Sequence, residues 1–325
     1  MRSALVTGAG GFIGSHLVEF LCARDWNVRA LVRYTSAGGI GFLAELDGRF
    51  TDRVEIVRGD LRDPDFVDEA VRGIDVIFNL AALIGIPYSY DAPESYIQTN
   101  VVGTLNVLRA ARRWGAGRLV QTSTSEVYGS AQFVPMDETH PLHPQSPYAA
   151  SKVASDQLAL SFHRSFGTPV VVIRPFNTYG PRQSPRAVIP TVVSQALFSD
   201  RISIGSLDPT RDFLYITDTC AAFAAVGEVP GLDGNEFNCA SGHGVTIADL
   251  IERVFAVTGR RVPVDRDPVR VRPAASEVDR LIGSGDRLAR EAGWAPTIGL
   301  DTGLLRVVEW VAAHREQFDV QRYAK

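Results

Sequence analysis

The residue types best suited to acid–base chemistry lie between positions 123 and 152. Tyr148 and Lys152 are four residues apart, so in a helix that Pro147 opens they share one face, a turn apart. A phenol titrates near ~10 in water, and a neighbouring ammonium favours the phenolate. Tyr148 could therefore act as a base near neutral pH. A surface tyrosine beside a solvated lysine has the same spacing, and the motif alone leaves both interpretations open.

A second group of polar residues precedes this pair. Ser123, Thr124, Ser125 and Glu126 follow the apolar run 118–122, which predicts a buried strand. Three hydroxyls and a carboxylate at the carboxyl end of a strand suit the crevice in which open α/β sheets bind ligands. The alternative is a turn with a capping serine and an exposed glutamate.

The elements that must position these groups begin at the amino terminus. The apolar strand expected at 3–7 runs into a glycine-rich loop, and a helical pattern follows at 15–23. Backbone amides of such a loop and the helix amino terminus bind a pyrophosphate. The sequence therefore predicts a dinucleotide site that includes Gly8, Gly11, Phe12, Ile13 and Gly14.

The end of the next strand, expected at 27–32, indicates which dinucleotide is bound. An acidic residue at this point would accept a hydrogen bond from the ribose of NAD, but the chain has Arg33, followed by Thr35 and Ser36. A guanidinium suits the 2′-phosphate of NADP. Arg33 therefore favours NADP, unless it only stacks on the adenine.

Further strands are expected at 54–57 and 75–80, and a helix at 94–113. Strand and helix alternate through this half, which predicts an α/β fold with a Rossmann-type doubly wound parallel sheet and a smaller C-terminal α/β substrate domain. Small residues after the fourth strand would let the backbone approach the dinucleotide. The residues assigned to the cofactor here are Asp60, Leu61, Leu80, Ala81, Ala82 and Asn100, together with Tyr148 and Lys152.

Composition excludes several classes of protein. The 325 residues carry a net charge of -4 and no basic stripe with aromatics, so nucleic acid is not an expected partner. Three single cysteines suggest unpaired thiols in a reducing compartment. No apolar run reaches the ~18 residues of a membrane span, and no His, Cys or carboxylate spacing indicates a metal site. We expect a cytoplasmic protein without a membrane or metal partner.

Seven short motifs occur in a fixed order along the chain: TGAGGFIG (7–14), GDLRD (59–63), NLAA (79–82), STSEVYG (123–129), PYAASK (147–152), RPFNTYGPRQ (174–183) and TRDFLYITD (210–218). Together they resemble the motifs of the extended short-chain dehydrogenases/reductases that act on nucleotide sugars, in that family's order. Within that family the chain is most similar to the N-acetylglucosamine nucleotide 4,6-dehydratases of the legionaminic-acid type.

The resemblance implies a role for each catalytic candidate. Tyr148, assisted by Lys152, would take the proton of the C4 hydroxyl, and Thr124 would hydrogen-bond the C4 ketone. Glu126 would take the C5 proton before the C6 hydroxyl leaves, and a tightly bound NAD(P) would be recycled. Ser125 stands where dTDP-glucose dehydratases carry an aspartate. The C6 acid would then be Glu126 or a water held by Ser125.

The second half of the chain resembles the substrate-binding part of the family. Asn177, Arg211 and Arg272 would bind the diphosphate. Taken singly, each arginine is better interpreted as a surface residue, and the family's order of motifs favours binding. The resemblance implies a dinucleotide domain at 1–178 with a returning segment at about 212–238, and a nucleotide-sugar domain at 179–211 and 239–325. It also implies a homodimer, in which helices 94–113 and 147–166 form a four-helix bundle with their copies.

Other functions remain open. UDP-glucuronate decarboxylases share the Ser-Thr-Ser-Glu run, but segment 144–147 offers no cation for a substrate carboxylate. A 4-epimerase is less consistent with Glu126, which would promote elimination from the ketone. A non-catalytic dinucleotide sensor would not need Thr124, Tyr148 and Lys152. The sequence does not choose between UDP- and GDP-N-acetylglucosamine.

Overall fold

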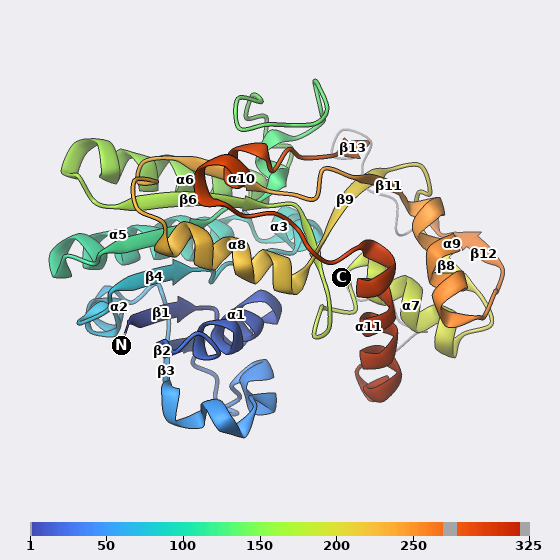
Figure 1. Ribbon diagram of the computed structural model, residues 1–325, viewed down its shortest axis with the longest axis horizontal. Helices are drawn as coiled ribbons and strands as arrows, with labels where there is room; N and C mark the ends of the chain where they lie inside the picture. The colour runs from blue at the N-terminus through green and yellow to red at the C-terminus, as the bar shows by residue number, and fades with distance from the viewer. Residues whose placement is uncertain (1, 269–277, 319–325) are drawn as a thin grey trace.

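The larger sheet of the molecule is built mainly from the amino-terminal half of the chain (Figure 1). The computed structural model describes residues 2–268 and 278–318. Seven parallel strands lie in the order β10-β6-β5-β4-β1-β2-β3. Their bounds are β1 Ser3–Thr7, β2 Asn27–Arg33, β3 Val54–Gly59, β4 Val76–Asn79, β5 Arg118–Thr122, β6 Val170–Pro175 and β10 Glu236–Cys239. The strand order reverses at β1 and β4, which is the switch point where such sheets bind ligands. The predicted Rossmann-type sheet is confirmed.

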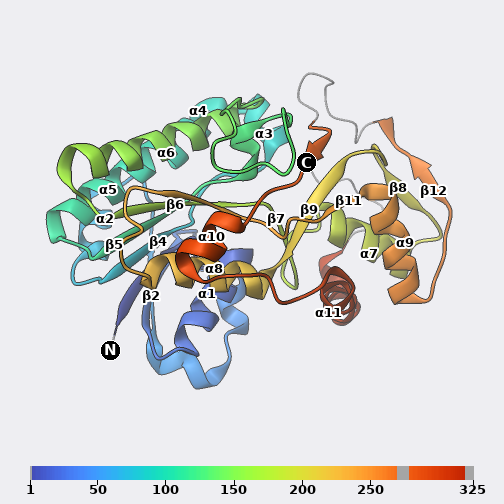
Figure 2. The same ribbon diagram turned by 45° about the horizontal axis from the view of Figure 1, so that its top comes forward.

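Helices cover both faces of this sheet, so its strands are apolar on both sides. Figure 2 shows α5 and α6 on one side of the sheet and α1 and α8 on the other. Within β1, Ala4 and Val6 pack on the α1 and α8 side, whereas Leu5 packs on the α5 and α6 side. The bounds are α1 Phe12–Cys22, α2 Pro64–Val71, α5 Gly103–Trp114, α6 Pro147–Phe166 and α8 Ile216–Glu228.

The carboxyl-terminal half forms a smaller α/β layer beside the large sheet (Figure 1). Strand β9 pairs with β7, β11 and β13, and β8 pairs with β12. The chain leaves this layer at the end of β9 and rejoins the large sheet through α8 and β10. The bounds are β7 Asn177–Tyr179, β8 Ile202–Ile204, β9 Thr210–Tyr215, β11 Gly244–Thr246, β12 Val264–Arg266, β13 Arg280–Leu281, α7 Val188–Phe198, α9 Ile247–Thr258, α10 Asp286–Ala292 and α11 Leu300–Ala313.

One helix expected from the sequence differs in the structure. The segment 94–113 is divided into α4 (Pro93–Tyr96), a π-helical turn (Ile97–Val102) and α5. A π turn contains one residue more than a turn of α-helix, so its side chains point in directions that a regular helix would not give them. Here it points Asn100 inward, where the side chain bonds to two neighbouring segments. Short elements complete the chain: α3 Ile86–Asp91 and 3₁₀ turns at Gly41–Glu45, Gly48–Arg53, Ser125–Tyr128 and Arg315–Gln317.

No helix in 2–268 or 278–318 is long and apolar enough to cross a membrane. Over the same residues, no group of three or more His, Cys, Asp or Glu side chains is placed to hold a metal ion.

Candidate active site

The glycine loop after β1 is shaped to receive a pyrophosphate. Gly8 has a φ of 69°, which favours glycine. A Cβ on Gly14 would lie 2.2 Å from the Gly8 carbonyl oxygen, and a Cβ on Gly8 would lie 3.0 Å from the Ala81 backbone nitrogen. The loop therefore folds directly against the start of α1, where Phe12 and Ile13 open the helix. First-turn N–H groups have no partner within the helix and attract an anion, so these residues fit the cofactor.

The buried hydroxyl of Thr7 fixes the segment that lies against the glycine loop. Thr7 Oγ1 donates to Asn79 Oδ1 at 2.8 Å and accepts from the backbone nitrogens of Leu80 and Ala81, each at 3.0 Å. The segment Leu80–Ala82 is thereby fixed beside Gly8. The sequence analysis assigned Leu80, Ala81 and Ala82 to the cofactor but missed Thr7, because a threonine within an apolar strand also reads as an ordinary β residue.

The expected adenosine end of the site lies at the carboxyl ends of β2 and β3. Arg33 is exposed there and pairs in register with Gly59. Arg62 donates to both carboxylate oxygens of Asp60, from Nε at 2.9 Å and from Nη2 at 2.6 Å. These bonds to Arg62, with a contribution from the charge of Arg33, hold the pKa of Asp60 below its usual value. Leu61 is buried and its carbonyl accepts from Asn106. Arg33 and Asp60 thus lie together at one edge of the site.

The side chain of Asn100, which is expected to bind the cofactor, forms hydrogen bonds within the protein. Its Oδ1 accepts from the Leu83 nitrogen at 2.8 Å, and its Nδ2 donates to the Leu83 carbonyl at 3.0 Å and to Ser151 Oγ at 2.9 Å. The side chain is buried, and both hydrogens of its amide are already used. Asn100 instead ties the loop after β4 to α6, the helix that carries Tyr148 and Lys152.

Helix α6 carries Tyr148 and Lys152, the central pair of the site, and their four-residue spacing predicted this helix. Ser146 caps its amino terminus by accepting from the Ala149 nitrogen at 3.1 Å, and Pro147 occupies the first turn. Tyr148 and Lys152 are both buried. The surface interpretation of this pair is therefore wrong, because a solvated lysine would not lie in a protein interior.

The Ser-Thr-Ser-Glu segment follows the end of β5 and lies near Tyr148. Thr124 caps a 3₁₀ turn by accepting from the Glu126 nitrogen at 3.3 Å, and its hydroxyl lies close enough to the Tyr148 phenol to act toward a lower pKa of that phenol. The charge of Glu126 reaches the same phenol. Ser125 is buried, and Glu126 is half-buried. The structure thus gathers Thr124, Glu126 and Tyr148 around one point.

Burial dominates the titration of the central pair. It raises the pKa of Tyr148 well above the usual value, and the charges of Glu126 and Asp156 add to the rise, whereas the bond to Thr124 opposes it. Burial lowers the pKa of Lys152 to about 8, and Asp156 opposes that shift. The expected lowering of the pKa of Tyr148 is not met in the protein alone, because the loss of hydration on burial raises this pKa.

The residues expected to bind the diphosphate lie on neighbouring strands. Asn177, on β7, donates to the Asp212 carbonyl at 3.1 Å. Arg211, on β9, is buried and donates to the Thr210 carbonyl at 3.1 Å. Because β7 and β9 pair in parallel, the two side chains are brought to the same part of the smaller layer. Arg272 lies outside the described residues.

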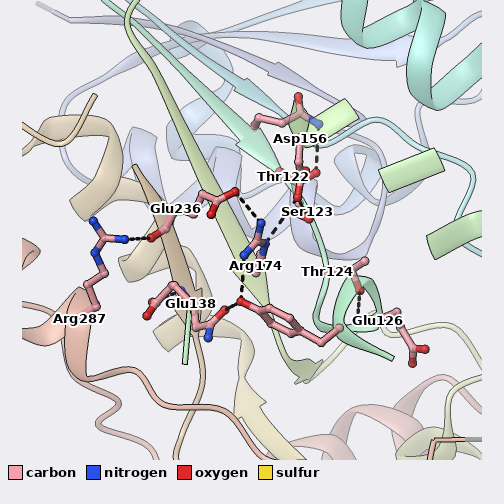
Figure 3. Close-up of polar contacts among 12 residues, drawn as sticks. Thr122, Ser123, Thr124, Glu126, Glu138, Asp156, Arg174, Glu236 and Arg287 are labelled. Carbon is pink, nitrogen blue, oxygen red and sulfur yellow. Dashed lines mark hydrogen bonds and ion pairs between the residues drawn. The ribbon is translucent and has the colours of Figure 1, made fainter. Parts of the chain in front are cut away.

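A network of buried charged residues connects α6 to β6 (Figure 3) and was not predicted from the sequence. It contains Asp156, one turn after Lys152 on α6, and Arg174 on β6. Two signals could have indicated it: the continued four-residue spacing from Tyr148 through Lys152 to Asp156, and an arginine at the end of the apolar run 170–173.

Comparisons with known proteins agree with this arrangement. Residues 5–307 match the family model described as GDP-mannose 4,6 dehydratase. The chain belongs to this family. A dTDP-glucose 4,6-dehydratase of Streptomyces niveus is 34% identical over 319 residues, which cover 96% of this chain and 93% of that protein.

Solved structures of related enzymes share the whole fold. The dTDP-glucose 4,6-dehydratase DesIV of Streptomyces venezuelae, solved with NAD bound, superimposes with a TM-score of 0.86 at 32% identity and covers 99% of this chain and 100% of its own. The UDP-glucose 4-epimerase of Thermus thermophilus, in complex with NAD, has a TM-score of 0.85 at 29% identity and covers 96% and 99%. The extended short-chain dehydrogenase/reductase resemblance is therefore confirmed for the family, and the fold is shared by dehydratases and epimerases.

Proposed function

We propose that the protein is a nucleotide-sugar 4,6-dehydratase that recycles a tightly bound NAD(P). The observation that carries the proposal is the closeness of Thr124 and Glu126 to Tyr148, whose pKa both residues influence, in a fold whose glycine loop fits a dinucleotide. A base for a hydroxyl and a separate carboxylate for a carbon acid are the two groups that a C4 oxidation followed by elimination requires.

The oxidation at C4 uses the residues at the start of α6. A bound dinucleotide would supply the chemistry of hydride acceptance from C4 and later return to C6. Tyr148 takes the proton of the C4 hydroxyl, and Thr124 donates to the oxygen as it becomes a ketone. Tyr148 must be deprotonated for this step, and its raised pKa in the protein alone means that positive charge in the loaded site has to favour the phenolate. Lys152 supplies one such charge, and an oxidised nicotinamide carries another.

The elimination uses the 3₁₀ turn after β5. A C4 ketone acidifies the C5 hydrogen, because the resulting carbanion is an enolate. Glu126 takes this proton, the C6–O bond breaks, and the oxygen leaves as water with the proton that Glu126 or a water held by Ser125 delivers. Ser125 is buried and precedes Glu126 in the same turn, which supports this role for its hydroxyl. A proton then returns to C5.

Within this reaction we propose an N-acetylglucosamine nucleotide carried by UDP or GDP as the substrate. Ser125, in place of the aspartate of dTDP-glucose dehydratases, supports a substrate different from that of the relatives. Asn177, Arg211 and Arg272 would bind the diphosphate. Arg33 supports NADP at least as well as NAD, because it provides a guanidinium at the end of β2. Asp60, the carboxylate near it, is paired with Arg62.

We also propose the domain division and the homodimer stated above. Residues 1–178 with about 212–238 would hold the cofactor, and 179–211 with 239–325 the nucleotide sugar. Apolar side chains near the ends of α5 and α6 support an interface there: Trp114 is 37% exposed and Phe166 is 49% exposed.

A 4-epimerase is the second candidate, because an epimerase shares the fold at a TM-score of 0.85. Glu126 counts against it, since a base at C5 would convert its ketone into an elimination product. A glucuronate decarboxylase would need no C5 base.

A panel of substrates separates these reactions. The purified protein is incubated with dTDP-glucose, UDP- and GDP-N-acetylglucosamine and UDP-glucuronate, and products are weighed by mass spectrometry. Loss of about 18 mass units, the mass of water, from an N-acetylglucosamine nucleotide supports the proposal. The same loss from dTDP-glucose alone overturns the substrate but keeps the reaction. Loss of about 44, the mass of carbon dioxide, or unchanged mass with inversion at C4 overturns the reaction.

A further inference from the structure

A third ionisable residue continues the catalytic face of α6. Asp156 follows Lys152 by four residues, as Lys152 follows Tyr148, so the three side chains lie along one face of the helix. Asp156 is fully buried. A carboxylate is seldom kept in the interior unless other groups compensate for its lost hydration, so its partners indicate what it does.

One oxygen of Asp156 is held firmly and the other is open. Ser123 Oγ donates to Oδ2 at 2.6 Å, and Arg174 Nε lies 3.5 Å from the same oxygen. Ser123 is itself fixed, because its nitrogen donates to the Ile173 carbonyl at 2.7 Å. In the described part of the chain, Asp156 Oδ1 is buried and has no hydrogen-bond partner. The carboxylate is therefore clamped through one oxygen only.

The charge of Arg174 is already balanced on its other side. Arg174 Nη2 donates to Glu236 Oε1 at 2.7 Å, and Nη1 donates to the Tyr128 hydroxyl at 3.0 Å. That hydroxyl in turn donates to Asn238 Oδ1 at 2.7 Å. Figure 3 shows Arg174 between Glu236 and the Ser123 side of the network. The charges therefore alternate in sign along Glu236, Arg174, Asp156 and Lys152, and the net charge of the four groups is zero. Because Glu236 already balances Arg174, Asp156 can act as the counter-charge for the lysine.

We propose that Asp156 is a positioning residue for Lys152: its clamped carboxylate is the buried counter-charge that keeps the lysine side chain cationic and aimed at the site beneath Tyr148. The catalytic part of this proposal rests on the proposed function of Tyr148 and Lys152. The geometry supports it, because Asp156 is the one acidic residue of α6 and follows Lys152 by one turn on the same helix face.

The opposing effects on the two groups agree with this assignment. Burial lowers the pKa of Lys152 to about 8, and Asp156 raises it. Burial raises the pKa of Asp156 to about 6; Arg174, Ser123 and Lys152 lower it, and Glu236 raises it. Glu126 and Tyr96 face the neighbouring Tyr148. Between about pH 6 and about pH 8, Asp156 is therefore a carboxylate while Lys152 is an ammonium.

The composition of the chain makes a direct test feasible. Only two residues are lysines, Lys152 and Lys325, among 33 basic residues. Lys325→Arg therefore leaves Lys152 as the single lysine, and protein labelled with lysine carrying ¹³C at Cε gives one lysine signal by NMR. The pH at the midpoint of its chemical-shift change is the pKa of Lys152, read without substrate or turnover.

The decisive variant is Asp156→Asn, which keeps the shape and removes the charge. We expect the Lys152 midpoint to fall by roughly one pH unit or more. Glu236→Gln is the matched control, because it removes the other carboxylate on Arg174, and it should leave the midpoint nearly unchanged. An unchanged midpoint in Asp156→Asn overturns the proposal. An equal fall in both variants also overturns it, since any nearby acid would then suffice.

A milder variant keeps the test decisive if Asp156→Asn does not fold. Ser123→Ala removes only the clamp on Oδ2, so the midpoint should fall in the same direction by a smaller amount, and no fall overturns the proposal. The dehydration assay is then run on each folded variant across pH. The alkaline limb of kcat should move to lower pH with the NMR midpoint. A protein that shows the NMR shift but dehydrates no nucleotide sugar refutes the proposed function and leaves the pairing of Asp156 with Lys152 standing.

Discussion

Thr7→Val tests whether one hydroxyl organises the dinucleotide end of the site. Valine has nearly the shape of threonine but neither donates nor accepts a hydrogen bond. The change therefore leaves Asn79 Oδ1 and the backbone nitrogens of Leu80 and Ala81 without the partner they have at 2.8–3.0 Å. Because the side chain of Thr7 is fully buried, the replacement itself creates no new exposed apolar surface.

The magnitude follows from these three bonds. A hydrogen bond contributes about 0.5–1.5 kcal/mol, and a polar group left buried without a partner costs about 1–3 kcal/mol. Leu80 and Ala81 are half-buried, so water can reach them in part, which favours the lower end of this range. We expect Thr7→Val to lower the free energy of unfolding by about 3–5 kcal/mol. That is a large share of the ~5–15 kcal/mol typical of folded proteins.

Thr7→Ser is the matched control, because it keeps the hydroxyl and deletes one buried methyl group at a cost of about 1 kcal/mol. Urea unfolding of both variants, freed of nucleotide, gives the difference, and calorimetry gives the affinity for NAD. The loop that Thr7 holds lies against Gly8, so Thr7→Val should also bind NAD more weakly than Thr7→Ser. A difference in stability below about 1 kcal/mol between the two variants, or equal affinities for NAD, would refute the reasoning.

Three further predictions use simpler measurements. Nucleotide released by heating should include NADP, and Arg33→Asp should shift binding toward NAD; release of NAD alone from both proteins would mean that Arg33 only covers the adenine. Light scattering at micromolar protein should show a particle of about twice the chain mass, and a monomer would contradict the four-helix bundle. Because the pKa of Lys152 is lowered to about 8 in the folded protein, the folded state loses this proton before the unfolded state. The contribution of Lys152 to stability should therefore rise with pH above about 8, by up to about 1.4 kcal/mol per unit, so the difference in the free energy of unfolding between the wild type and Lys152→Met should change with pH by this amount. The buried cysteines, whose pKa values are raised, have the opposite effect in both proteins and cancel in this difference.

The regular parts of the fold could be predicted because their signals are local. Strands β1 and β5 begin and end at the expected residues, and α6 begins at Pro147 and ends at Phe166 as expected. The proline and the capping serine mark the start of α6, and the glycine at 167 marks its end. The π turn at Ile97–Val102 was not predictable in this way, since it arises where Asn100 bonds to Leu83 and Ser151, which are contacts with other segments.

The site shows the same division. Two short motifs were enough to select the catalytic candidates, which are Thr124, Glu126, Tyr148 and Lys152. The bonds of Asn100 could not be predicted, since its position near the cofactor loop is compatible with several partners and only the structure shows that its amide is used within the protein. The titration of Tyr148 could not be predicted, because the loss of hydration depends on burial by residues distant in the chain.

Glu126→Gln tests the division of labour at the centre of the proposed reaction. Glutamine has the shape of glutamate but is not a base, so the variant should keep the C4 oxidation and block the elimination. Tyr148→Phe is the companion variant, and it should stop the reaction before C4 is oxidised. Both should keep the fold, which circular dichroism can check.

The most direct measurement is a single turnover of Glu126→Gln with the substrate that the panel identifies, followed by absorbance near 340 nm and by mass spectrometry. We expect reduced nicotinamide to accumulate together with a 4-keto sugar that keeps its C6 hydroxyl, while Tyr148→Phe shows neither. Wild-type product formed in deuterium oxide should carry deuterium at C5. If Glu126→Gln instead yields dehydrated product at the wild-type rate, Glu126 is not the C5 base, and the proposed mechanism is contradicted.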